Sequence, residues 1–200
     1  MPKIVDHEVR RTETAEAFWR VVARQGIEGA NIRAVAAEAG WSRGIVEHYF
    51  ENKEELVLYA CRRAIESTLA ETRLRHEVFV GRKALRAVLL DCLASQSQEV
   101  WFELLSLAGR EPALAAELVR FDAEISAVIA EIIAEMIARR EAAADLDAAA
   151  EARGVFAFNV SLKVDARMQP EGQRKEVVEA QVERFLDGLM RAPQGTADGA

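Results

Sequence analysis

Two helix-start signals and a glycine lie close together between Asn31 and Ser42, and they restrict this part of the chain to short helices joined by a tight turn. Asparagine and serine are favoured N-caps because their side-chain oxygens accept hydrogen bonds from free N–H groups of the first helical turn. Gly40 lies between them, where a helix end favours a residue that adopts positive φ. The segment therefore predicts a helix closed by Gly40 and a second helix from Arg43 to about Tyr49.

Apolar residues at helical spacing support this arrangement on both sides of the turn. A first helix is expected over residues 7–25 and is ended by Gly26 and Gly29. In the helix that begins at Arg43, Val46 and Phe50 are spaced as a core pair. The expected buried face of the first helix consists of Ala15, Phe18, Trp19 and Val22. Short helices joined by a turn at Gly40 predict a helix-turn-helix.

Beyond this motif the sequence favours long helices. Asn52 and Glu55 form a start of the capping-box type for a helix that extends to about Val78. The chain has only 4 prolines and 11 glycines in 200 residues, and half of its residues are apolar, so the fold class is predicted to be all-α. Further helices are expected over 82–94, 97–109, 112–140, 146–168 and 171–191, with a disordered tail over 193–200.

Composition excludes several classes of protein. The net charge is −7, and residues 1–60 contain 8 Lys and Arg against 10 Asp and Glu, so any nucleic-acid contact must depend on where charges lie and not on an excess of them.

The N-terminus lacks a secretory apolar segment and no apolar run is long enough to cross a membrane, so a cytoplasmic location is expected. Cys61 and Cys92 lie in helical patterns and are expected to be reduced and buried. The three histidines, His7, His48 and His76, lack the spacing of metal ligands, and no cofactor motif is present.

Residues 10–60 resemble the DNA-binding domain of TetR-family transcriptional regulators. The resemblance rests on NIRAVAAEAG at 31–40, GWSRGIVEHYF at 40–50 and ENKEEL at 51–56. The HYF ending, the GIV triplet and PEG at 170–172 are most similar to the BetI-like branch. This resemblance implies a helix-turn-helix DNA-binding domain over 1–53 and a larger helical domain for ligand binding and dimerisation over 54–192.

The motif positions have expected roles in DNA binding. Ser42 caps a helix N-terminus, where free N–H groups favour a phosphate. Arg43 is placed to bind guanine in the major groove, and Gly44 lacks a Cβ and permits close approach of the backbone. The family resemblance implies contacts of His48 and Tyr49 with phosphates or thymine methyl groups, and of Lys53 with phosphate. It also implies that Asn31 and Arg33 form the DNA-contacting start of the second helix. The predicted DNA-binding residues are Asn31, Arg33, Ser42, Arg43, Gly44, His48, Tyr49 and Lys53.

Glu47 departs from the family pattern, which usually has a phosphate-binding tyrosine there. A carboxylate only accepts hydrogen bonds and is repelled by phosphate. Glu47 could accept from cytosine N4, or it could pair with Arg43 one helical turn earlier, and we favour the pairing. Trp41, where the family often has valine, is expected to pack the turn against the first helix.

The C-terminal part contains two narrow apolar seams in neighbouring helices. They could complete an intrachain core or form a two-fold interface with a second copy, and the pattern alone leaves both open. The candidate interface residues are Val155, Leu162, Val178, Val182, Phe185 and Leu189.

Aromatic and polar residues of the same part are candidates for a ligand site, although most such residues in a helical domain are core. Asn159 lies among apolar neighbours, so its amide is expected to bond either to a ligand or across a dimer seam. The candidate ligand-binding residues are Trp101, Phe102, Phe121, Met136, Phe156, Phe158 and Asn159.

These observations predict a homodimeric, ligand-responsive repressor that binds a near-palindromic operator in double-stranded DNA and is released by a small-molecule inducer. Repressor is preferred to activator only because it is commoner in the family. Two other classes compete: a helical scaffold or protein-binding module without DNA activity, and a small all-helical enzyme. An enzyme is disfavoured because no catalytic set of nucleophile and base is evident in the sequence.

Overall fold

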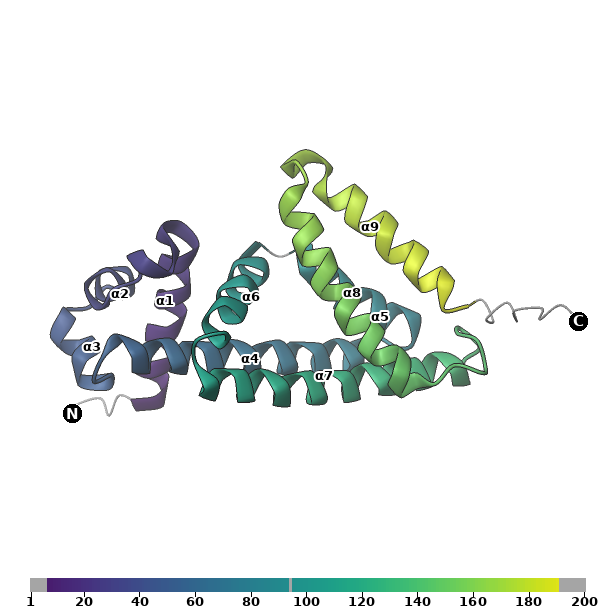
Figure 1. The fold of residues 1–200 in the computed structure, drawn as a ribbon, viewed down its shortest axis with the longest axis horizontal. Helices are drawn as coiled ribbons and strands as arrows, with labels where there is room; N and C mark the ends of the chain where they lie inside the picture. Colours follow the sequence, from purple (N-terminus) through teal and green to yellow (C-terminus); the bar gives the residue numbers. More distant parts are fainter. Residues whose placement is uncertain (1–6, 94, 191–200) are drawn as a thin grey trace, which may run out of the picture. The chain divides into compact units, whose positions relative to one another are not determined.

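The computed structural model describes residues 7–93 and 95–190, without the side chains of Cys92 and of residues 95–100. Within those residues all of the regular secondary structure is helical, as the composition predicts (Figure 1). The elements are α1 (His7–Gly29), α2 (Ile32–Ala39), α3 (Arg43–Tyr49), α4 (Lys53–Val78), α5 (Arg82–Leu90), the 3₁₀ turn η1 (Asp91–Leu93), α6 (Ser95–Ala108), α7 (Pro112–Ala138), α8 (Ala148–Met168) and α9 (Glu171–Gly188).

The chain forms two compact units. Residues up to Thr68 together with Glu99–Val119 form the N-terminal unit, and Leu69–Gln98 with the residues from Arg120 onward form the C-terminal unit. From Glu99 onward α6 belongs to the N-terminal unit, and its Leu104 lies in the same apolar core as Phe18. The domain boundary after residue 53 remains a sequence prediction, and the proposed tail over 193–200 lies outside the described residues.

The turn chemistry forms largely as the sequence predicts. Gly26 has φ 69° and interrupts α1 with a kink. The Asn31 side chain accepts from the Ala34 N–H at 3.0 Å, and Gly40, at φ 72°, donates to two carbonyls of α2. These bonds start and close α2 within eight residues, which leaves room for α3 directly after the turn.

Ser42 is the N-cap residue of α3, as predicted, but the expected side-chain bond is absent. Ser42 has the extended backbone of an N-cap, but its side chain makes no capping hydrogen bond. Its backbone carbonyl accepts from the Ile45 N–H at 3.1 Å, so the first turn is closed by the main chain.

The start of α4 confirms the capping-box pattern with a shift of one residue. Asn52 Oδ1 accepts from the Glu55 N–H at 2.8 Å, and the Glu55 carboxylate accepts from the Glu51 N–H at 2.8 Å. The reciprocal bond therefore reaches Glu51 and not Asn52.

The core of the N-terminal unit contains the face predicted for α1. Ala15, Phe18, Trp19 and Val22 are buried, and so are Val46 and Phe50 from the end of α3. The Trp19 indole also donates to the Ala60 carbonyl of α4 at 3.1 Å, which satisfies its polar edge inside the core. The buried thiol of Cys61 lies in the same core, and its pKa is raised to about 12 by burial.

In the C-terminal unit, α8 and α9 pack against one another and α9 also packs against α5 (Figure 1). This packing bears on the apolar seams, for which the sequence left an intrachain core and a two-fold interface both open. Val155, Leu162, Val178 and Val182 have no exposed surface within the single chain, and Leu189 is 6% exposed. Such side chains have no surface left to offer a second copy, so they are intrachain core. Phe185 is half-buried and stacks on Phe158, with ring centroids 4.2 Å apart.

Ion pairs fasten α5 to α9 beside this core. Arg82 donates to Glu183 at 2.9 Å and to Asp187 at 2.7 Å, and Arg86 donates to Glu183 at 2.6 Å. The hydrogen bonds from Arg86 and Arg82 lower the pKa of Glu183.

Gly81 begins α5 in a backbone conformation that requires glycine. Its φ is 53° and ψ is −130°. Its N–H donates to Glu135 at 3.0 Å, and the N–H of Arg82 donates to Glu141 at 2.7 Å. A Cβ at residue 81 would lie 2.1 Å from the Glu141 carboxylate oxygen.

We predict that Gly81→Ala lowers the free energy of unfolding by about 2 kcal/mol or more, because it adds backbone strain and displaces Glu141 from the helix start. Denaturant unfolding followed by helical circular dichroism measures the change. Gly172→Ala is the matched control, because a Cβ there meets no atom within 4 Å. Equal stability of Gly81→Ala and Gly172→Ala would contradict the assigned role of Gly81.

Candidate nucleic-acid interface

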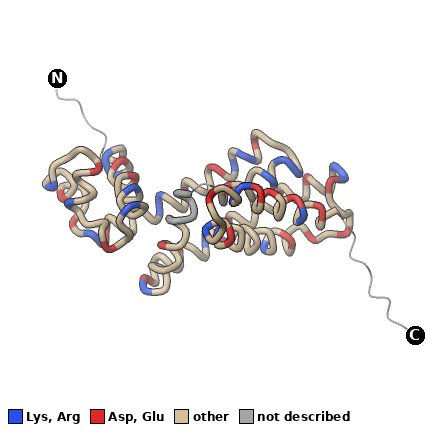
Figure 2. Tube along the Cα trace, turned by 90° about the horizontal axis from the view of Figure 1, so that it is seen from above, with Lys and Arg blue, Asp and Glu red and all other residues tan. Residues whose placement is uncertain are grey.

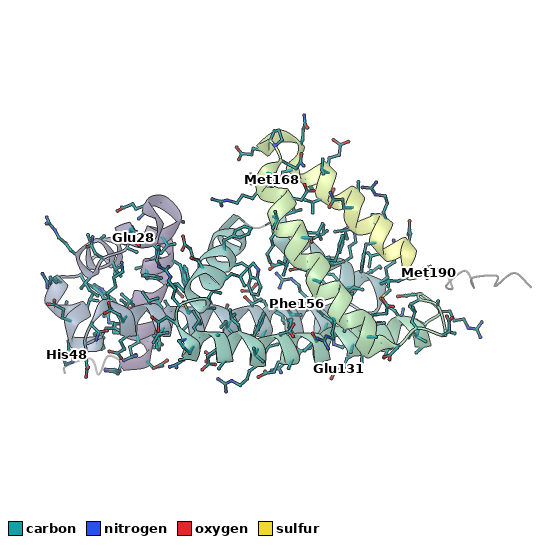
Figure 3. The ribbon with its side chains drawn as sticks, in the orientation of Figure 1. Glu28, His48, Glu131, Phe156, Met168 and Met190 are labelled. Carbon is teal, nitrogen blue, oxygen red and sulfur yellow. The ribbon has the colours of Figure 1, made fainter. Side chains whose placement is uncertain are left out.

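The α3 helix presents one narrow face to the core and the rest of its surface to solvent. Val46 is fully buried, whereas Gly44, Glu47 and His48 are exposed, and the Arg43 side chain is 69% exposed. His48 on α3 is labelled in Figure 3. A short helix with a single buried residue is held by its neighbours and can meet a partner with most of its circumference.

Gly44 has no explanation inside the protein. A Cβ built at this residue meets nothing within 4 Å, and the backbone is ordinary helix. Glycine within a helix is less stable than alanine by roughly 0.5–1 kcal/mol. The space over Gly44 leaves room for another molecule to approach the α3 backbone.

Arg43 and Glu47 form the ion pair predicted from their spacing. Arg43 Nε donates to Glu47 Oε1 at 2.7 Å, one turn along α3. Both side chains are well exposed, and exposed pairs of this kind contribute only about 0.3–0.5 kcal/mol. The pair restricts the direction of the Arg43 side chain without adding much stability.

The remaining predicted DNA-binding residues lie at the start of α2, the end of α3 and the start of α4. Asn31 and Arg33 are exposed, although the Asn31 side chain is engaged in capping α2. Tyr49 is half-buried, and its ring makes edge contacts with His7 and His48 at 4.8 and 5.1 Å between centroids. Lys53 donates from Nζ to the Ile27 carbonyl at 3.0 Å, so its ammonium group has an intrachain partner beside the α1 kink.

Trp41 packs the turn against α1, as predicted. It is half-buried, and the Arg10 guanidinium lies 4.9 Å from the centre of its ring. The contact is a cation–π interaction between α1 and the residue that follows the turn.

Sequence reasoning missed Arg11, which contacts the end of α3. Its guanidinium donates to the Tyr49 carbonyl at 2.9 Å and to Glu55 at 3.0 Å. The pKa of Glu55 is lowered, mainly by the Glu51 N–H and then by Arg11. No signal in the sequence separates Arg11 from the other arginines of α1, because its partners lie 38 and 44 residues away.

The candidate ligand residues divide between the two units. Trp101 and Phe102 belong to α6 in the N-terminal unit, where Trp101 packs against the core around Phe18. The others belong to the C-terminal unit: Phe121 and Met136 are buried, and Phe156, Phe158 and Asn159 are half-buried. Phe121 and Phe156 meet edge to face, with centroids 6.0 Å apart.

Asn159 has a third kind of partner that the sequence did not suggest. Its amide nitrogen lies 3.4 Å from the Val88 carbonyl and 3.5 Å from the Leu89 carbonyl, at the end of α5. Neither a ligand nor a second copy is needed to satisfy this donor, because each backbone carbonyl has two lone pairs and those at the end of α5 can accept a second hydrogen bond.

No group of three or more His, Cys, Asp or Glu in the described part of the chain could hold a metal ion. Among the helices of that same part, none is long and apolar enough to span a bilayer.

The geometry of α2, the Gly40 turn and the exposed α3 defines a helix-turn-helix unit attached to a helical C-terminal unit. A model of bacterial regulatory proteins of the tetR family matches residues 16–60, and a model of the C-terminal part of BetI-type transcriptional repressors matches residues 81–191. The second match covers more than half of the chain. The protein belongs to the TetR family of transcriptional regulators and has a C-terminal domain of the BetI type.

Curated relatives include the transcriptional regulator PksA of Bacillus subtilis, 34% identical over 114 residues. The match covers 54% of this chain and 56% of PksA. BetI of Burkholderia thailandensis is 30% identical over 122 residues, which cover 57% of this chain and 62% of BetI. The chain thus spans a little over half the length of these relatives, and both are regulators and not enzymes.

Solved structures share the fold over nearly the whole chain. A TetR transcription regulator from Haloarcula marismortui has a TM-score of 0.75 at 17% identity, over 92% of this chain and 100% of that one. A transcriptional regulator from Saccharomonospora viridis, solved in complex with choline, has a TM-score of 0.68 at 18% identity, over 90% and 96% of the two chains.

Replacement by alanine is predicted to have opposite effects on protein stability at Gly40, in the turn, and at Gly44, in α3. Gly44→Ala should raise the stability of the protein by up to ~1 kcal/mol, because it adds a helix-favouring side chain in open space. Gly40→Ala should lower it by about 1 kcal/mol, because alanine disfavours positive φ. Chemical denaturation measures both, and a loss of stability in Gly44→Ala would show that glycine is needed by the fold.

Proposed function

We propose that the protein is a ligand-responsive regulator that binds a near-palindromic DNA operator as a homodimer, most simply as a repressor. Membership of the TetR family and the helix-turn-helix geometry support the class. The observation that favours DNA most directly is Gly44, since its lack of a Cβ leaves room for a partner on the exposed face of α3. The major groove of a duplex admits a helix with this exposure.

Arg43 is the proposed base-reading residue, and Glu47 directs it. The ion pair uses the Nε atom of Arg43, so the two terminal nitrogens take no part in it. Those nitrogens form the fork that binds guanine O6 and N7. Glu47 is repelled by phosphate, so this role also explains how an acid is tolerated on a DNA-facing helix.

The residues around α3 are proposed to bind the sugar-phosphate backbone. Asn31 and Arg33 at the start of α2 and His48 at the end of α3 are exposed on the same unit. Tyr49 and Lys53 have structural partners and would contribute through the atoms those partners leave available. Figure 2 shows basic and acidic residues interspersed along these helices, so the proposed contacts depend on position and not on net charge.

The proposed dimer uses the outward face of α8 and not the buried seam. This face has exposed residues of small or apolar type at alternating three- and four-residue spacing, of which Val164 is 41% and Met168 77% exposed. That spacing suits the close pairing of two helices. The residues are Gly154, Ala157, Ser161, Val164 and Met168.

A small molecule bound in the C-terminal unit is proposed to release the operator. The aromatic contact of Phe121 with Phe156 and the stack of Phe158 on Phe185 place rings from α7, α8 and α9 in that unit. A structural neighbour holds choline, and aromatic rings are the usual partners of quaternary ammonium groups. An effector of this kind acts by its different affinity for the two states of the protein.

Arg43→Ala is predicted to lower affinity for the preferred DNA sequence by about 1–3 kcal/mol and to relax base preference at one position. Selection from a randomised duplex library, followed by titration at fixed salt, measures both. Arg62→Ala is the matched control, since it removes the same charge from the N-terminal unit without touching α3. Unchanged affinity and preference in Arg43→Ala would remove α3 from the interface.

Val164→Arg is predicted to shift the protein from dimer to monomer at micromolar concentration, because it adds a charge to the outward face of α8. Sedimentation velocity measures the change. Val119→Arg alters another exposed valine, on α7, and should leave the dimer intact. A monomeric wild-type protein, or equal behaviour of the two variants, would reject this interface.

A further inference from the structure

Arg11 lies where the α1 helix meets the end of α3. The carbonyl it contacts belongs to Tyr49, the last residue of α3, at 2.9 Å. The last carbonyls of a helix have no partner within the helix, and a cation is favoured there by the helix dipole. Arg11 therefore supplies a donor to a carbonyl at the C-terminal end of α3.

The Arg11 side chain is fixed on every side. Its guanidinium carbon lies 4.4 Å from the ring centre of Phe50 and 4.5 Å from that of Tyr59, and a second nitrogen donates to Glu55 at 3.0 Å. Only 19% of the side chain is exposed. A planar fork that stacks on rings and donates in two directions is a property of arginine that lysine lacks.

The part of α1 that supplies Arg11 is itself tied to α4. The Tyr59 hydroxyl donates to Glu8 at 2.6 Å and lies 3.2 Å from the Thr12 hydroxyl. Glu8, Arg11 and Thr12 lie on adjacent turns of α1. Because the bonds from Tyr59 hold this part of α1 in place, the bond from Arg11 to Tyr49 also holds the end of α3 in place.

Without this bond, α3 is held mainly by its apolar side. Val46 and Phe50 anchor it to the core, and a helix resting on so few side chains can tilt about them. Arg43 begins the helix about 9 Å from Tyr49 at the rise of an α-helix, so a tilt about the anchor displaces Arg43 as well.

We propose that Arg11 is a positioning residue that fixes the orientation of α3 and thereby the base preference of Arg43. This inference rests on the proposed function, in which α3 enters the major groove. Arg11 acts through the Tyr49 carbonyl and does not itself contact DNA.

The test compares Arg11→Ala and Arg11→Lys with one control. Arg62→Ala is that control, because it removes an arginine of α4 that pairs with Glu117 and does not contact α3. The probes are the duplexes that wild-type protein enriches from a randomised library, and shuffled duplexes of the same length. The readouts are the ratio of the two affinities at fixed salt and the hydrogen exchange of the α3 backbone amides.

Both Arg11 variants are expected to lower the affinity ratio by about tenfold, with little change in binding to shuffled DNA. The Phe50 amide, which donates to Val46, should exchange faster in both, and Arg62→Ala should resemble wild type. Three results would overturn the proposal: an unchanged ratio in folded Arg11→Ala, full rescue by lysine, or an equal loss on all duplexes with a shallower salt dependence. The last result would mean a phosphate contact or general unfolding.

Failure of the proposed function itself would look different. If wild-type protein enriches no sequence, the DNA assignment fails, and exchange of the α3 amides alone then decides whether Arg11 holds this helix. Slow, unchanged exchange in Arg11→Ala would reject the positioning role under either outcome.

Discussion

The N-terminal unit depends on the burial of Val46 and Phe50 at the end of α3. A helix of seven residues is far below the length at which helices persist alone in water, so α3 exists only because the surrounding core accepts these two side chains. The Gly40 turn brings α3 to that core, and the start of α4 continues from it. Since so little of α3 is buried, nearly all of its surface is available for recognition. Because so few of its side chains are buried, the orientation of α3 is also sensitive to single polar contacts.

Local signals in the sequence were sufficient to predict the short helices and the turn of the N-terminal unit. Asn31 and Gly40 act within a few residues, so their chemistry could be predicted without knowing the fold. The pairing of Arg43 with Glu47 was predictable for the same reason, because the α-helix alone sets the distance between them. Ser42 shows the limit of such reasoning: its backbone has the expected conformation, but the side-chain bond depends on a rotamer that the sequence does not specify.

Long-range relations were not predictable from the pattern. Val178 and Val182 form an apolar seam whether they face another helix of the chain or a second copy, because both arrangements bury the same residue types. Only the packing of α8 on α9 shows that their surface is already used. Asn159 is similar, since an isolated amide indicates a need for partners without saying that α5 supplies them. For the candidate DNA interface, the residues of α3 could be predicted from the sequence. The contact of Arg11 with Tyr49 and the intrachain bond of Lys53 could not.

The ion pair on α3 has a consequence for kinetics. Because the Arg43 guanidinium and the Glu47 carboxylate lie 2.7 Å apart, their fields largely cancel at distances beyond a few ångströms. The residue proposed to choose the bases therefore contributes little to long-range attraction toward a polyanion, and a protein of net charge −7 gains little steering elsewhere. Association should then be governed by short-range fit after contact, and discrimination should be expressed in how long the complex lasts.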